Sequence, residues 1–171
     1  GAYAAAVITV MFNGSLVLAL LVAWLIGVIF SVIISRLLQK LSGLQFALAT
    51  LAIAELVRLG LSSWAWQIPR AKNYEVGPDG VHGFRDIRWL FENQMGPETY
   101  LALSATLLLS TLLLIWKISQ TKLGLSIQSV GLDTELATVQ GEPVAFLQTL
   151  TQTFAGGLGA LAGALYAHQA T

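Results

Sequence analysis

The side chains of this sequence that could do chemistry are few and lie far apart. It contains no cysteine, which excludes thiol nucleophiles, disulfides and cysteine-based metal sites. His82 and His168 have no second histidine or carboxylate at ligand spacing, which argues against a metal site. The ATP-binding pattern G-x-x-x-x-G-K-[ST] is absent, and no arrangement of nucleophile, base and oxyanion donors can be recognised among the serines and threonines. We therefore expect a chain that is not an enzyme, with no catalytic residue, no metal and no cofactor of its own.

Glu55 and Arg58 are the two charged residues inside an apolar segment. Their spacing of three places them on one face of a helix, where they can pair. Ionisable groups in a membrane are costly, and they usually face the interior of a protein or a wet pathway. Two interpretations stay open, namely a polar element beside a pathway and a structural ion pair near the end of its helix.

The composition indicates that these residues are carried by membrane helices. Hydrophobic residues make up 56% of the chain and charged residues 11%, and the mean hydropathy is +0.72. An ordinary soluble domain has roughly 25% charged residues. The formal net charge is zero, so no basic surface for a nucleic acid is indicated. We expect a protein that is embedded in a lipid bilayer and has no nucleic-acid partner.

The apolar segments predict an all-α fold, a polytopic transmembrane helical bundle of about five spans with a short cytoplasmic helix. A spanning helix needs about 20 mostly apolar residues, and Asn13, Gly14 and Ser15 divide the uncharged stretch over residues 1 to 35. Neither end resembles a natural terminus, so we interpret the chain as part of a longer one, forming a single domain over residues 1–171. The predicted spans are residues 1–12, which look truncated, 16–35, 44–64, 100–116 and 143–168.

Two short basic loops predict how the spans are oriented. Arg36 with Lys40, and Lys117 with Lys122, lack nearby acidic residues, so the positive-inside rule places both loops in the cytoplasm. Residues 117–142 are then a cytoplasmic loop, and residues 65–98 are an outer loop.

The outer loop has two recognisable features. Gly77, Pro78, Asp79 and Gly80 form a turn-prone stretch. Further along, four apolar residues fall on one helical face and predict a short interfacial helix: Phe84, Ile87, Leu90 and Phe91.

The cytoplasmic loop contains a short predicted helix that Asp133 can cap, and Gly141 followed by Pro143 ends it. A helix of this length is not stable alone in water. Its Leu136 and Val139 need a cover, and a groove on another protein would provide one.

The last apolar segment carries small residues at four-residue spacing. Ala155, Gly159, Gly163 and Ala167 form one row. Small residues let helix backbones approach closely, so we expect this row to pack against another helix. The adjoining row is also small and consists of Gly156, Ala160 and Ala164.

Four motifs occur along the chain in the same order as in the branched-chain amino-acid permease family of ABC transporters (LivM type), which the chain therefore resembles. Glu135, Leu136 and Ala137 followed by Gly141 are similar to the E-A-A-x-x-x-G loop with which importer permeases bind their ATPase subunits. The family's glutamate usually stands where this chain has Thr134. The other motifs are the opening GAYAAAV, the segment GLQFALATLAIAELVRL from Gly43 to Leu59, and GPDG from Gly77 to Gly80.

The resemblance implies a permease subunit of the bacterial inner membrane that imports branched-chain or related amino acids. The ATP would be hydrolysed by two ABC ATPase subunits, and the other partners would be a second homologous permease and a periplasmic binding protein. The outer loop with Gly77, Asp79 and Gly80 would be either an ordinary extracellular turn or a docking site for that binding protein. The residues that couple the permease to the ATPases would be Asp133, Thr134, Glu135, Leu136, Ala137 and Gly141.

Two alternatives remain at this point. The same scaffold could import urea, short amides or a sugar. The chain could also be a membrane anchor or assembly subunit that transports nothing.

Overall fold

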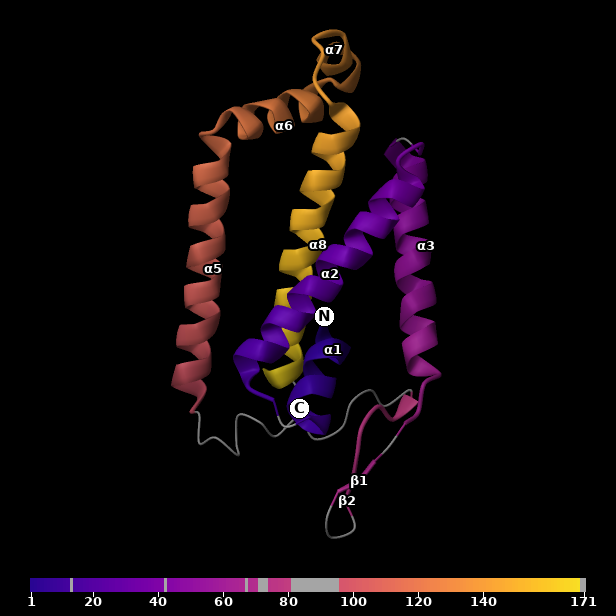
Figure 1. The fold of residues 1–171 in the computed structure, drawn as a ribbon, viewed down its shortest axis with the longest axis vertical. Helices are drawn as coiled ribbons and strands as arrows, with labels where there is room; N and C mark the ends of the chain where they lie inside the picture. Colours follow the sequence, from indigo (N-terminus) through magenta and orange to yellow (C-terminus); the bar gives the residue numbers. More distant parts are fainter. Residues whose placement is uncertain (13, 42, 67, 71–73, 81–95, 170–171) are drawn as a thin grey trace.

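The structure is a computed structural model that describes residues 1–171 except residues 13, 42, 67, 71–73, 81–95 and 170–171 (Figure 1). The described part is an all-α helical bundle with one small hairpin. In chain order the elements are α1 (Ala2–Ala6), the π-helix η1 (Val7–Met11), α2 (Leu16–Leu38), α3 (Gly43–Ser62), β1 (Ile68–Arg70), β2 (Tyr74–Val76), α5 (Pro97–Ser119), α6 (Lys122–Leu132), α7 (Thr134–Val139) and α8 (Val144–Gln169).

The long helices lie where the apolar segments predict them, and each end falls within three residues of the predicted one. Three of them are long and apolar enough to cross a membrane: Leu16–Leu38, Gly43–Ser62 and Glu98–Ser119. At about 1.5 Å per residue, each reaches roughly the 30 Å of the hydrocarbon core. The 26 residues of α8 are long enough as well, although its glutamines and threonines make it less apolar. The five-span interpretation beyond these three helices stays a prediction.

The core of the bundle lies where α2 crosses α8, with the N-terminal segment against both (Figure 1). Small residues allow this crossing, because Ala19, Ala23 and Ala164 are completely buried together. A Cβ atom added to Gly156 would overlap the side chain of Ser31, so the two helix backbones pack directly against each other.

The close contact between α8 and α2 is made by the row of Gly156, Ala160 and Ala164, which adjoins the row of Ala155 and Gly159. A Cβ atom on Gly159 would have no heavy atom within 4 Å, and both residues are exposed. These two residues make no close helix contact within this chain, and the prediction that their row packs against another helix stays a prediction. Further along the same row, a Cβ atom on Gly163 would lie 3.6 Å from the backbone nitrogen of Ala2, and Ala167 packs against the cluster of Ala6 and Val10.

The basic loops and the hairpin lie at opposite ends of the molecule. The turn between α2 and α3, which contains Lys40, lies at the same end as α6 and α7, and the hairpin lies at the other end (Figure 1). This arrangement is the one that the predicted topology requires, and the orientation in a membrane stays a prediction.

The outer segment forms a hairpin that the sequence did not predict. β1 and β2 are antiparallel, with Ile68 opposite Val76 and Arg70 opposite Tyr74. The pairing continues beyond the strands, since the Trp66 N–H donates to the Pro78 carbonyl at 2.9 Å and Ala65 bridges to Asp79. Gly80 ends this pairing with a φ of 56°. The interfacial helix predicted over residues 84 to 91 lies outside the described residues.

Candidate functional site

The six residues of α7 form the tip of the molecule at the end with the basic loops (Figure 1). The Asp133 Oδ1 atom accepts hydrogen bonds from the N–H groups of Glu135 and Leu136, both at 3.0 Å. These bonds satisfy two of the free N–H groups at the start of the helix. The predicted N-cap is therefore present in the structure.

The other end of α7 is closed by Gly141. Its φ of 82° is in the left-handed region, which glycine adopts without a steric penalty. The Gly141 N–H donates to the Thr138 carbonyl and the Glu142 N–H to the Ala137 carbonyl, both at 3.0 Å. This pair of bonds is a Schellman motif, which satisfies carbonyl groups at the end of the helix and turns the chain into α8.

A buried cluster of Val130, Ala137 and Leu147 holds α7 against α6 and α8. The Ser126 hydroxyl also donates to the Glu142 Oε1 atom at 2.9 Å, which ties α6 to the junction of α7 and α8. Ala137 is only 1% exposed, so it anchors the tip and does not face a partner. A displacement of α7 would therefore be passed directly to α8.

Three exposed apolar side chains lie on α7 or directly before it, and we call them the tip patch: Leu132, Leu136 and Val139. Their exposed fractions are 89%, 55% and 85%. Leu136 and Val139 are the exposed residues that the sequence predicts, whereas Leu132 was not predicted; it is the last residue of α6, and the extended Asp133 separates it from α7. Glu135 is exposed beside the patch. Such a surface can dock into an apolar groove that carries a positive charge at its edge.

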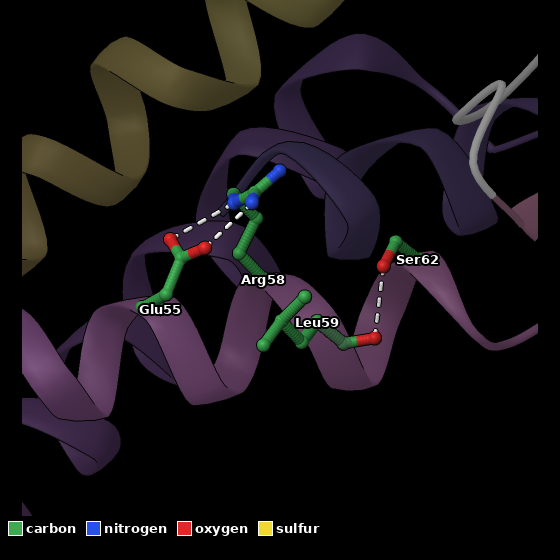
Figure 2. A network of polar contacts seen from close by, with 4 residues as sticks. All are labelled: Glu55, Arg58, Leu59 and Ser62. Carbon is green, nitrogen blue, oxygen red and sulfur yellow. Dashed lines mark hydrogen bonds and ion pairs between the residues drawn. The ribbon is translucent and has the colours of Figure 1, made fainter.

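The ion pair of Glu55 and Arg58 is present on α3. The Arg58 Nε atom donates to Glu55 Oε2 at 2.9 Å. A terminal guanidinium nitrogen of Arg58 donates to Glu55 Oε1 at 2.5 Å (Figure 2). Both side chains are at least half exposed, and α3 has no buried residue. Within the described residues nothing else pairs with them, so both interpretations of the pair stay open.

A cavity of about 930 Å³ lies behind the tip, between the turn joining α2 to α3 and the three helices α6, α7 and α8. Three glutamines contribute to its wall, namely Gln39, Gln148 and Gln152, together with Lys40 and Glu135. This site was not predicted from the sequence. A signal was available, since Gln148 and Gln152 lie one helical turn apart in a segment without charged residues.

His168 links α8 to the N-terminal segment. Its Nδ1 atom lies 2.7 Å from the Ala164 carbonyl oxygen, and its Nε2 atom lies 3.2 Å from the hydroxyl oxygen of Thr9. Both side chains are buried, which indicates a structural contact. In the described ranges no group of three or more histidine, aspartate or glutamate side chains could hold a metal ion.

The comparisons with known proteins extend this description. A family model described as a permease component of branched-chain amino acid transport systems matches residues 1–171. No curated protein and no solved structure matches the chain. The matched range is the whole sequence, and the tip and the long apolar helices are compatible with a transport protein of the membrane. The chain therefore belongs to the family of branched-chain amino acid transport permease components.

Proposed function

We propose that this chain is the permease subunit of an ABC importer in the bacterial inner membrane, where it translocates branched-chain or related amino acids into the cell. Two separate ATPase subunits would hydrolyse the ATP, and a second permease would complete the membrane part. Membership of the permease family supports the transport role. The observation that carries the coupling to an ATPase is the tip patch, which lies on the fixed helix α7 and at the adjoining end of α6.

The tip patch is suited to bind a partner because burying it removes apolar surface from water. Full burial of a leucine or valine side chain contributes about 1.5–3 kcal/mol. Since Ala137 and Leu147 fix α7 to α8, a partner that moves the tip also moves a long helix of the bundle. An ATPase that closes on ATP could thereby change which side of the membrane the pathway faces.

The ends and the sides of the molecule offer places for the other partners. The hairpin end with Asp79 would face the periplasmic binding protein. No residue of α3 is buried, and large apolar side chains are exposed on several sides of α5, including Leu108 and Leu112. These faces would contact lipid or the second permease.

The proposal can be tested with Val139→Lys and Leu136→Lys in the complete complex. Both side chains are exposed, so the variants should insert normally and yet lose most of the co-purified ATPase and the uptake of amino acids. Gln120→Lys serves as the control, because Gln120 is exposed near the same end but outside the tip patch. Normal ATPase retention and uptake in both variants would show that α7 is only a connector. A complex that hydrolyses ATP but takes up no amino acid would contradict the import function itself.

A further inference from the structure

We propose that the cavity behind the tip binds a zwitterionic amino acid with an aliphatic side chain from the cytoplasmic side, and that its occupancy slows transport. This inference rests on the proposed function, because it assumes that the substrate is an amino acid and that α7 contacts the ATPase. The cavity volume of about 930 Å³ lies within the ~300–1,000 Å³ that is usual for small-molecule sites.

The polar part of the cavity wall has unused hydrogen-bonding groups. The side-chain amides of Gln39, Gln148 and Gln152 line the cavity, and none has a hydrogen-bond partner among the described residues. Gln148 and Gln152 lie one turn apart on α8, Gln148 exposed and Gln152 half-buried, so both amides are open to the cavity. A carboxylate can accept from these amides, and an ammonium group can donate to them.

The cavity also carries one charge of each sign. Lys40 comes from the turn after α2, and Glu135 comes from α7. Neither forms an ion pair with another described residue. A zwitterion presents a carboxylate and an ammonium group together, so it matches this pair of charges better than an anion or a cation alone.

The remainder of the wall is apolar and suits an aliphatic side chain. It includes Phe46 from α3, Ile127 from α6 and Leu147 from α8. A ligand with a charged end and an apolar side chain would fit both parts of this wall. Its charged end would contact the amides, and its side chain would contact these apolar residues. Sugars and urea lack either the charges or the apolar part.

The position of the cavity connects ligand binding with the ATPase contact. Thr134 and Glu135 belong to α7 and also line the cavity. A ligand that binds this conformation of the permease more tightly than the other conformations of the transport cycle stabilises it. The cycle must then overcome that stabilisation to leave this conformation. Amino acid on the cytoplasmic side is therefore expected to lower the rate of ATP hydrolysis.

The test uses the complete importer in proteoliposomes, with the ATPase side outward and the binding protein with saturating leucine inside. Leucine added outside should reduce ATP hydrolysis in a saturable way. Gln148→Leu and Gln152→Leu should each raise the concentration for half-inhibition by about fivefold, the effect expected for the loss of about 1 kcal/mol from one hydrogen bond. Gln128→Leu is the matched control, because Gln128 is exposed on α6 and does not line the cavity. Direct binding of labelled leucine to the complex without ATP should weaken in the same order.

Two analogues test the charge requirement. 4-Methylpentanoate lacks the amino group and 3-methylbutylamine lacks the carboxylate, so each should inhibit less than leucine. Equal inhibition by either analogue would overturn the zwitterion assignment.

The outcomes also separate this inference from the proposed function. Normal leucine uptake without inhibition or binding from the ATPase side would overturn the inference and leave the import function intact. Inhibition that is unchanged in both glutamine variants, or shifted equally in Gln128→Leu, would overturn the assignment to this cavity. A complex that transports no amino acid at all would overturn both.

Discussion

At the scale of single residues, Gly141 determines how the chain leaves α7 and enters α8. A β-branched residue at a φ of 82° is strained, because its Cβ atom comes too close to the neighbouring backbone, at a cost of about 1–2 kcal/mol. We expect Gly141→Val to lower the thermal stability of the detergent-solubilised complex and to release the ATPase. Gly141→Asn should be much milder, because asparagine tolerates the left-handed region. Equal behaviour of the two variants would mean that this turn has no influence on the tip.

The pair of Glu55 and Arg58 allows another prediction at this scale. The replacement of one partner leaves a single charge in the apolar surroundings of α3, whereas replacement of both leaves none. We expect Glu55→Gln and Arg58→Gln each to reduce the amount of complex in the membrane, and the double variant to restore it. Immunoblotting of membrane fractions measures this, and lower abundance of the double variant than of either single variant would contradict it. Uptake by the double variant then separates the two open interpretations, since only a role in the pathway predicts a loss of transport at normal abundance.

At the scale of elements, the crossing of α2 and α8 gives a prediction about the two rows of small residues. Gly156→Leu forces a side chain into Ser31, and overpacking of this kind costs about 1–3 kcal/mol or more. Gly159→Leu places the same side chain in open space within this chain. We expect the first variant to unfold at a clearly lower temperature than the second, as measured by thermal unfolding in detergent. A greater loss of stability in Gly159→Leu would show that this row packs against another subunit or a further part of the protein.

The same elements show what the sequence could predict and what it could not. The length of each apolar segment predicts the long helices. The residue types at Asp133 and Gly141 predict the two ends of α7, because helix caps and left-handed turns depend on single residues. Gly27 and Ser31 of α2 lie directly against Ala160 and Gly156 of α8. The choice between the two rows of α8 therefore depends on residues in a different helix, which no local pattern contains. The cavity was missed for the same reason, since its glutamines come from the turn after α2 and from α8 and meet only in the folded chain. The helix α6 was missed because its glycines and serines resemble a loop.

At the scale of the whole molecule, the distribution of charge and the arrangement of the helices indicate the same orientation. Lys40, Lys122 and Glu135 lie at one end, whereas Asp79 and Glu98 lie at the end with the hairpin (Figure 1). Short basic loops stay in the cytoplasm, and an ATPase can reach the tip only from that side. The orientation that places the lysines in the cytoplasm therefore also places the tip patch on the side where an ATPase can bind it.

This agreement predicts the accessibility of single cysteines, which can be introduced cleanly because this sequence has none. Cysteines that replace Lys40, Lys122 or Glu135 should react with a membrane-impermeant maleimide only in inside-out vesicles. A cysteine in place of Glu98, which is exposed at the start of α5, should react in intact spheroplasts, and so should one in place of Asp79. Labelling with a permeant maleimide after detergent treatment controls for residues that are covered by a partner. If Glu98→Cys reacted only from the cytoplasmic side, the tip would face the periplasm, where no ATP is available, and α7 could not be the ATPase contact.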